Sequence, residues 1–104
     1  MTTSSFVEFI LDQLDGLPDV VSKRMFGGHG LYAGGVFIGI FADGLLYLKT
    51  DTTTRQPYIE AGMGPFQFQE KTLKNYYQVP VDVLEDTDTL KSWAQQSIKV
   101  AQAG

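Results

Sequence analysis

The sequence predicts an α+β domain in which one antiparallel sheet packs against helices. Two turn dipeptides, Gly34-Gly35 and Asp43-Gly44, each separate runs of apolar residues, and both tolerate the positive φ angles of two-residue hairpin turns. Helical periodicity is found near the two ends of the chain, and helix start and stop signals mark one short central segment. Such grouping of strands and helices is typical of the α+β class rather than of alternating βαβ units. We therefore expect the order α-βββ-α-ββ-α in a single domain spanning residues 1–104.

The first helix is predicted from its apolar stripe and from signals at both of its ends. Ser5 and Glu8 have the spacing of a capping box, in which each side chain binds a free backbone N–H group of the first turn. Gly16 suits a left-handed C-terminal cap, and Pro18 prevents continuation of the helix. The stripe consists of Val7, Ile10, Leu11 and Leu14.

The strands follow from the turn positions and from residue type. We expect a three-stranded meander over residues 24–33, 36–42 and 45–50, which are rich in aromatic and branched apolar residues. Two further strands are predicted, at Phe66–Gln69 and at about Tyr76–Val79, with the polar residues 70–75 forming the loop between them.

Two more helices are predicted after the meander. One spans roughly Thr54–Ala61, because Thr52, Thr53 and Thr54 are good N-cap residues and Pro57 is tolerated in a first turn. The last helix is capped by Asp86 or Thr87. Its buried stripe comprises Leu90, Trp93, Ala94, Ile98 and Ala101.

Composition excludes several classes of function. The chain has no cysteine, which rules out disulfides, thiolate zinc sites and cysteine nucleophiles and fits a reducing cytoplasm. The N-terminus resembles neither a signal peptide nor an anchor, and no apolar run is long enough to span a membrane. The net charge is −4, and the eight basic residues are spread along the chain without a basic stripe, so we expect no strong direct binding to nucleic acid.

The segment Gly27-Gly28-His29-Gly30 is the first candidate for a functional site. A glycine-rich loop with a reactive imidazole would suit a small-molecule binder or an enzyme. Phosphate-binding loops, however, lead from a strand into a helix, whereas these glycines lead into another strand segment. The structural alternative is a bulge or sharp bend in the first strand, where another backbone approaches closely. His29 is the only histidine, and no acidic partner is evident near it in the sequence.

Metal and nucleophile patterns give no positive signal for an enzyme. The acidic residues Asp82, Glu85, Asp86 and Asp88 lack the spacing of a calcium loop and suit the first turns of helices instead. None of the five serines lies in a nucleophile-elbow motif. We therefore expect no catalytic residues, no cofactor and no metal site.

Aromatic residues are abundant, with seven phenylalanines, five tyrosines and one tryptophan. If the strand prediction holds, Tyr76 and Tyr77 point to opposite faces of the sheet. One aromatic face of the sheet could then remain open as a protein-binding or self-association surface. The alternative is a sheet that is covered by helices on one side and whose tyrosine hydroxyls simply reach water.

One block of residues closely resembles a known family. The run Arg24-Met25-Phe26-Gly27-Gly28-His29-Gly30-Leu31-Tyr32 is similar to the N-terminal domain of the TfoX/Sxy competence regulators. The resemblance continues in order over nearly the whole chain, through Gly35, Phe37, Ala42-Asp43, Leu46–Lys49, Gly62, Pro65-Phe66, Tyr76-Tyr77, Val79-Pro80, Val83–Asp86, Leu90 and Trp93-Ala94.

That resemblance implies a fold similar to the secretion chaperones, which often dimerise, and a role in bacterial gene regulation. Full-length relatives work with the cyclic-AMP receptor protein at competence promoters. Those regulators carry a second, C-terminal domain, so we expect this chain to be a stand-alone N-terminal domain. A cytoplasmic co-regulator that contacts a transcription factor or polymerase component is the leading interpretation, and a chaperone-like or dimeric binding module unrelated to transcription is the alternative. The family offers no catalytic residues, and Arg24, Phe26 and Tyr32 are candidates for a shared surface because they lie in the signature block.

Overall fold

Six strands and four helices make up the part of the chain that the computed structural model describes, residues 5–25 and 28–103. The predicted α+β class is confirmed, and the element order contains one strand and one short helix more than expected. In chain order the elements are α1 (Ser5–Gln13), β1 (Val20–Met25), β2 (Gly28–Ala33), β3 (Val36–Ala42), β4 (Leu45–Lys49), α2 (Gln56–Glu60), β5 (Pro65–Phe68), β6 (Lys71–Gln78), α3 (Val81–Leu84) and α4 (Thr87–Ala103).

All the strands belong to one sheet with the order β1-β2-β3-β4-β6-β5, and every neighbouring pair is antiparallel. The two predicted hairpin turns are confirmed. Gly34 and Gly35 have φ angles of 59° and 86°, and Asp43 and Gly44 have φ angles of 54° and 73°. Positive φ at both central residues is what a two-residue type I′ turn requires.

The first predicted strand, residues 24–33, is two strands instead of one. Its N-terminal end belongs to β1 and the rest to β2, and the pairing of Met25 with Gly28 makes the two strands a hairpin. Residues 26 and 27 lie outside the described residues. Periodicity did not reveal β1, because after Val20 and Val21 the strand is mostly polar, which is typical of a strand at the edge of a sheet.

The central helix is shorter than predicted. It spans Gln56–Glu60, and its N-cap residue Arg55 makes no capping hydrogen bond through its side chain. The threonines before it form a separate turn around Asp51, whose Oδ1 accepts hydrogen bonds from the N–H groups of Thr53 (2.9 Å) and Thr54 (3.1 Å). The prediction of a threonine N-cap is therefore wrong, because the threonines belong to a turn that the Asp51 carboxylate stabilises before the helix begins.

The second hairpin also differs from the prediction. Strand β6 begins at Lys71 rather than near Tyr76, and the turn consists of Gln69 and Glu70, with a φ angle of 58° at Gln69. The polar residues that suggested a loop are strand residues, because much of β6 faces solvent. The residues after Pro80 form the four-residue helix α3, which we did not predict from the sequence.

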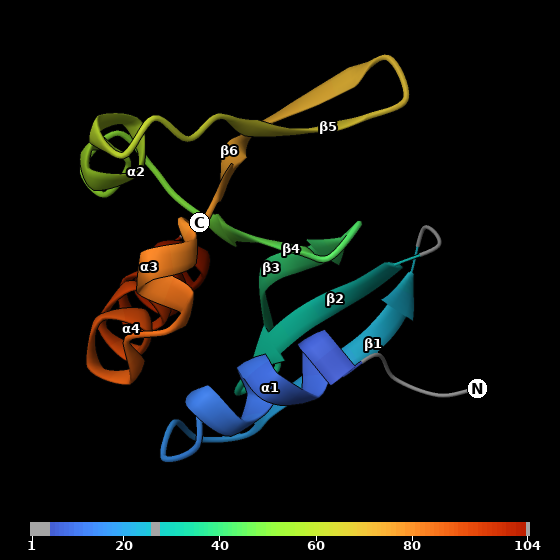
Figure 1. Cartoon of the computed structure of the whole chain (residues 1–104), viewed down its shortest axis with the longest axis vertical. Coiled ribbons are helices and arrows are strands. Elements are labelled where there is room, and N and C mark those ends of the chain that lie inside the picture. The colour runs from blue at the N-terminus through green and yellow to red at the C-terminus, as the bar shows by residue number, and fades with distance from the viewer. Residues whose placement is uncertain (1–4, 26–27, 104) are drawn as a thin grey trace.

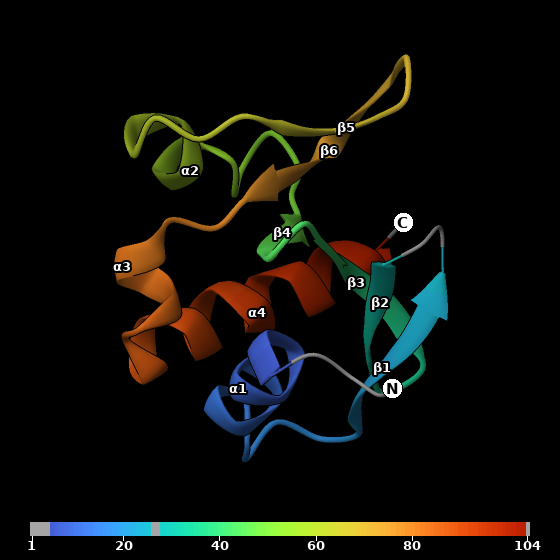
Figure 2. The same cartoon turned by 45° about the vertical axis from the view of Figure 1, so that its right-hand side comes forward.

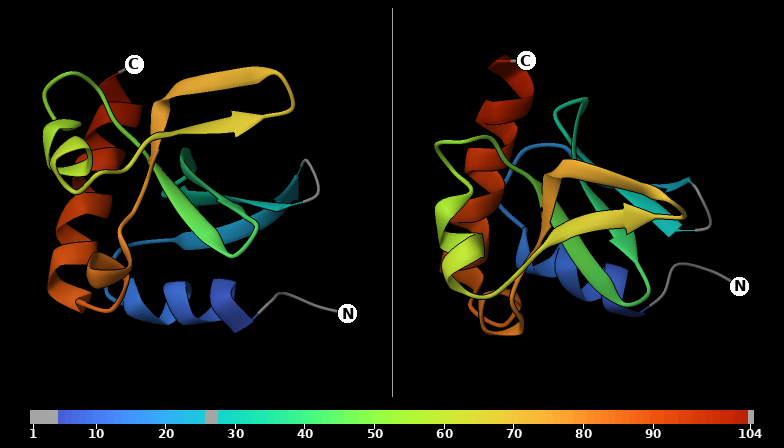
Figure 3. Two further views of the ribbon diagram at one scale, coloured as in Figure 1. Left: turned by 45° about the horizontal axis from the view of Figure 1, so that its top comes forward. Right: turned by 90° about the horizontal axis from the view of Figure 1, so that it is seen from above.

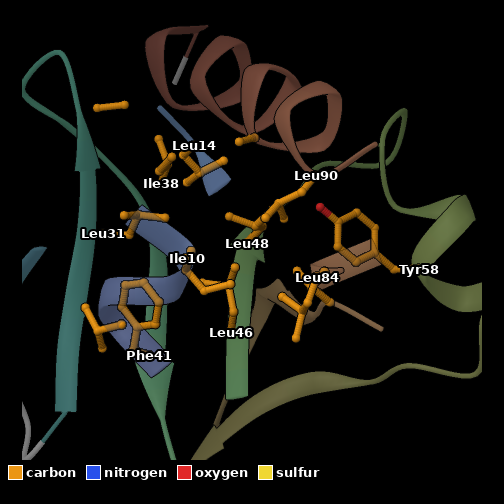
Figure 4. Close-up of a cluster of buried hydrophobic side chains, with 14 residues drawn as sticks. Ile10, Leu14, Leu31, Ile38, Phe41, Leu46, Leu48, Tyr58, Leu84 and Leu90 are labelled. Carbon is orange, nitrogen blue, oxygen red and sulfur yellow. The ribbon is translucent and has the colours of Figure 1, made fainter. Parts of the chain in front are cut away.

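Helices α1 and α4 form a layer against one face of the sheet, and the core lies between them (Figure 4). Ile10 of α1, Leu14 just after that helix and Leu90 of α4 meet Leu46 and Leu48 of β4, all with no exposed surface. Two of the predicted helix-end signals in this layer are confirmed, and the capping box of Ser5 and Glu8 stays a prediction. Gly16 has a φ angle of 104°, and Asp86 caps α4 by accepting a hydrogen bond from the N–H group of Thr89 (3.3 Å).

The β5–β6 hairpin projects from the sheet on the side away from α1 and α4 (Figures 1 and 2). Its pairing is irregular, because it passes from Pro65–Tyr77 to Phe66–Leu73 and leaves three residues of β6 without partners in β5. Figure 3 shows the hairpin on the opposite side of the sheet from α1. In the described residues, no helix combines the length and the apolar character needed to cross a membrane.

Candidate functional site

The two faces of the sheet carry different side chains. Alternate residues of a strand point to opposite sides, so Leu31 and Ala33 of β2, which belong to the core, place Tyr32 on the other side. We call the side that carries the core the inner face and the side that carries Tyr32 the outer face. Tyr77 packs with the core, whereas Tyr76 lies on the outer face, so the predicted division of these two neighbours is confirmed.

Three rings gather on the outer face. The ring centroids of Tyr32 and Phe37, which are partners in the β2–β3 register, lie 5.2 Å apart, and those of Phe37 and Tyr76 lie 5.6 Å apart. All three side chains are half-buried. These residues come from β2, β3 and β6, and we call them the outer aromatic cluster. Tilted rings at such separations attract one another beyond the effect of buried area.

A lysine contacts each of the two tyrosine rings of this cluster. The Lys23 Nζ atom is 4.9 Å from the ring centroid of Tyr32, and the Lys49 Nζ atom is 5.9 Å from that of Tyr76. Lys23 comes from the edge strand β1, and Lys49 comes from β4, which lies between the strands of Phe37 and Tyr76. Each ammonium group is attracted by the electron-rich face of its ring, while the carbon stem of the side chain covers apolar surface. Two positive charges therefore border the aromatic cluster.

The pKa values of two tyrosines report the environment of this face. Burial is the main cause that raises the pKa of Tyr76, and the nearby Tyr32 adds to it. Burial also raises the pKa of Tyr47, with a further contribution from the negative charge of Asp43. The outer face therefore has lysines around the aromatic cluster and a carboxylate near Tyr47.

A hollow of about 280 Å³ lies beside the cluster, between the end of β3 and strand β5. The ring of Phe66 contacts that of Tyr47 at 4.8 Å, and Phe66 and Phe68 are stacked at 6.3 Å. None of the described helices contributes a residue to the outer aromatic cluster or to this hollow. The hollow is lined by Met25, Gly28, Ile40, Phe41, Ala42, Asp43, Phe66, Gln67, Phe68 and Gln69.

Two glycines of the signature block allow close packing. A Cβ atom at Gly28 would lie 2.3 Å from the backbone oxygen of Phe41 in β3, so the predicted close approach of another backbone is confirmed. A Cβ atom at Gly30 would lie 2.4 Å from the sulfur of Met25 and 2.8 Å from the ring of Phe37. The side chains of Met25 and Phe37 on the outer face therefore pack directly against Gly30.

The expected bulge is present, but in a different strand. Pairing between β2 and β3 passes from Tyr32–Phe37 to Leu31–Gly39, which leaves Ile38 as an extra residue in β3. Ile38 is completely buried. We had placed the irregularity in the first strand because the glycines are there, but the described part of that segment is paired without a shift along β1.

The remaining signature residues are divided between the faces and the edge. Arg24 is exposed on β1 and is paired in register with His29, which is half-buried. His29 lines a second hollow of about 200 Å³ together with Phe6 of α1 and Asp43. Phe26 and Gly27 lie outside the described residues. The block is thus one hairpin rather than one site: Met25, Gly30 and Tyr32 serve the outer face, whereas His29 faces the helical layer.

The charges are segregated between the sheet and the rest of the domain. Five of the eight basic residues lie in strands, and none of the twelve Asp and Glu residues does. The chain is acidic overall, but the folded sheet is basic. Linear spacing concealed this segregation because the basic residues come from separate strands, namely Lys23 and Arg24 in β1, Lys49 in β4, and Lys71 and Lys74 in β6.

A polar network around the buried Thr50 and Ser97 links the start of α2 and the helix α4 to the sheet. The Thr50 hydroxyl donates to the backbone oxygen of Asn75 (3.0 Å) and accepts from Arg55 Nε (3.0 Å), and Arg55 Nη2 donates to Asn75 Oδ1 (3.0 Å). The buried Ser97 hydroxyl of α4 donates to the backbone oxygen of Lys49 (2.7 Å). These bonds orient the end of β4 that carries Lys49, so the network supports the outer face from behind.

Tyr58 of α2 packs against α4 beside this polar network. It is 3% exposed and packs against Trp93 with a centroid separation of 4.4 Å. Burial raises the pKa of its phenol far above the usual range, and a hydrogen bond with Ser97 opposes part of this effect. The tyrosine is therefore neutral and structural rather than an acid or base poised for catalysis.

The acidic residues after Pro80 serve as helix caps and surface groups. Asp86 caps α4, while Asp82, Glu85 and Asp88 are exposed in or beside the two last helices. Within residues 5–25 and 28–103, no three His, Asp or Glu side chains are grouped so that they could hold a metal ion.

The arrangement defines a small α+β domain whose distinctive feature is a basic sheet with an aromatic outer face. A model of the TfoX N-terminal domain matches residues 12–101, and the chain belongs to that family. The resemblance noted in the signature block is thereby confirmed. A comparison with curated proteins gives no match.

Proposed function

We propose that this domain is a cytoplasmic co-regulator of transcription that acts by contacting a transcription factor or a polymerase component. It works without catalysis and without strong direct binding to nucleic acid. The contact is made by the outer aromatic cluster and the lysines that border it. Membership of the TfoX N-terminal domain family supports a regulatory role.

The observation that carries this proposal is the outer aromatic cluster itself. Tyr32, Phe37 and Tyr76 are half-buried on a face to which no described helix adds a residue. Aromatic residues are enriched at the centres of protein interfaces, because they bury a large area at a small cost in conformational entropy. The remaining elements, including the polar network of Thr50 and Arg55, are accounted for by the stability of the fold.

The test is affinity capture from native extract with the purified domain as bait, followed by mass spectrometry. A bait that carries Tyr32→Ser and Tyr76→Ser is run in parallel, together with a control bait that carries Thr52→Ala on an exposed turn. The proposal expects a transcription factor or polymerase component with the unchanged and control baits, and at least a tenfold lower yield with the double variant. Circular dichroism verifies that each bait is folded.

Deletion of the gene, followed by transcript profiling, provides the second measurement. We expect a defined group of transcripts to change and to be restored by the unchanged protein but not by the double variant. Capture of one unrelated client together with an unchanged transcript profile would refute the regulatory role and would support the chaperone-like alternative.

A further inference from the structure

We infer that the partner segment bound by the outer aromatic cluster is short, acidic and apolar, with carboxylates that pair with Lys23 and Lys49 and an apolar side chain that packs on the rings between them. This inference deepens the proposed function and rests on it. It names the chemistry of the partner at the same surface.

Charge complementarity carries the first step. The strands hold five basic residues and no carboxylate, although the whole chain has a net charge of −4. Lys23 and Lys49 are the two cations in contact with the rings of the outer aromatic cluster. A partner with carboxylates is attracted to this part of the surface and is repelled elsewhere. Charge complementarity therefore determines both the sign of the partner's charge and the place where it binds.

The spacing of the two lysines suggests the length of the segment. Strand β1 lies three positions from β4 in the sheet, and adjacent strands are about 4.8 Å apart. The register aligns Lys23 with Tyr47, so Lys49 lies two residues further along, and the two backbone positions are separated by about 16 Å. An extended chain advances about 3.3 Å per residue, so about five residues span that distance. The inferred segment therefore has two acidic positions about five residues apart, with an apolar residue between them.

The rings favour an apolar side chain over a nucleic-acid base. Tyr32 and Tyr76 each have an ammonium group over the ring, at 4.9 and 5.9 Å, so one face of each ring is already occupied. The rings are also tilted by 50–54° against Phe37 and form a ridged surface rather than parallel platforms for stacking. Base stacking requires an accessible flat face, whereas a leucine or phenylalanine side chain fits between tilted rings.

Long-range charge gives a second reason. All twelve carboxylates lie outside the strands, and Asp43 lies near Tyr47 in the turn between β3 and β4. A long polyanion that crossed the face would approach such carboxylates within a screening length of about 8–10 Å. A segment with two or three carboxylates is short enough to stay near Lys23 and Lys49.

The probe for this inference is a fluorescein-labelled twelve-residue peptide of Gly and Ser that carries two Glu residues about five positions apart, with Leu and Phe between them. Fluorescence anisotropy measures its affinity for the full chain at low and at physiological salt. Three matched probes keep the length constant: one has Lys in place of every acidic residue, one has Ser in place of Leu and Phe, and one is the oligonucleotide dT12. We expect the acidic and apolar peptide to bind at least tenfold more tightly than each of the three.

Charge-reversal variants locate the site. Lys23→Glu together with Lys49→Glu should weaken binding of the peptide by about tenfold or more, because two attractions become repulsions. Lys91→Glu together with Lys99→Glu makes the same change in net charge on α4, and we expect its affinity to stay within about twofold of the unchanged chain. Thermal unfolding of each variant verifies that the chain is folded.

The outcomes separate the inference from the function on which it rests. Equal weakening by the two charge-reversal variants, or tighter binding of dT12 than of the peptide, would overturn the inferred partner chemistry. If the transcription partner is captured through the outer face but the acidic and apolar peptide does not bind, the inference fails and the proposed function stands. If no transcription partner is captured while the peptide binds with the expected charge dependence, the co-regulator role fails and the surface chemistry stands.

Discussion

Replacement of Gly28 by alanine should destabilise the sheet at the point where the signature block meets β3. The added Cβ atom would lie 2.3 Å from the backbone oxygen of Phe41, whereas ordinary contacts of this kind begin at about 3.4 Å, so the two strands must separate by about 1 Å. A hydrogen bond of normal length is largely lost when its donor and acceptor move apart by that distance. No change of side-chain rotamer can relieve this clash, because the atom that the new Cβ would meet is the backbone oxygen of Phe41.

The expected cost is about 2 kcal/mol, in the range of 1–3 kcal/mol for overpacking at a constrained site. For a domain of this size, that loss lowers the melting temperature by roughly 8–16 °C. Urea denaturation and thermal unfolding monitored by circular dichroism measure the free energy of unfolding and the melting temperature. A reduced urea midpoint with an unchanged slope would show that stability changed and that the extent of unfolding did not.

Gly64→Ala is the matched control. No atom lies within 4 Å of a Cβ atom built at Gly64, so the same chemical change meets no obstacle there. We expect it to be neutral or to stabilise the chain by up to about 1 kcal/mol, because alanine restricts the unfolded chain. If Gly28→Ala unfolds within about 0.5 kcal/mol of Gly64→Ala, the close approach to Phe41 does not constrain this position and the reasoning is refuted.

Three further predictions follow from single contacts. Several hydrogen bonds lower the pKa of Asp51, and the largest effect comes from Thr53. The carboxylate therefore stabilises the fold above about pH 4, near its unfolded pKa. This stabilisation is lost as the pH falls through the lowered folded pKa. The melting-temperature gap between the chain and Asp51→Asn should therefore be present at pH 7 and narrow toward pH 2.5; a gap independent of pH would contradict this assignment. Ser97→Ala leaves the backbone oxygen of Lys49 without its buried donor and should cost about 1–3 kcal/mol in urea denaturation, whereas a change below about 0.3 kcal/mol would mean that the bond is dispensable. Asp86→Ala removes the cap of α4 and should cost about 1 kcal/mol with a small loss of helical signal at 222 nm, and Asp86→Asn, which keeps the acceptor, should restore most of it.

Much of the fold was predictable because its strongest signals are local. Gly34-Gly35 and Asp43-Gly44 require positive φ angles that few other pairs adopt, and both form the predicted turns. The helix cap at Asp86 and the left-handed residue at Gly16 likewise depend on neighbours a few positions away. Elements with such chemistry at their ends were placed within a few residues.

The errors in the strands have a different cause, since each depends on partners distant in the sequence, whereas the error in the central helix comes from a local turn that competes with the helix start. Strand β1 is polar because it is an edge strand, which only the sheet order reveals. The short central helix and the long β6 follow from the turn at Asp51 and from the solvent on one side of the second hairpin. Local propensity does not contain this information.

The candidate site was predictable only in part. The opposite orientations of Tyr76 and Tyr77 were anticipated from alternation along one strand, and an open aromatic binding face was one of the two alternatives that this alternation left. The roles of Lys23 and Lys49 were not, because they lie on strands that the sheet order separates and that the sequence separates by 26 residues. The signature block marked the correct hairpin, but its histidine and its tyrosine serve opposite faces.

The extra residue in β3, Ile38, allows the two hairpins that share this strand to differ in which side chains point to the outer face. The turn at Gly34-Gly35 sets Phe37 opposite Tyr32, and the turn at Asp43-Gly44 sets Phe41 opposite Leu46. A regular strand would have to send one of these two phenylalanines to the wrong side, since side chains alternate strictly. Ile38 absorbs the mismatch, so its deletion should leave Phe37 and Phe41 on their present sides and remove only its own buried side chain, whereas one further residue inserted between these two phenylalanines should exchange surface and core roles along half of the strand.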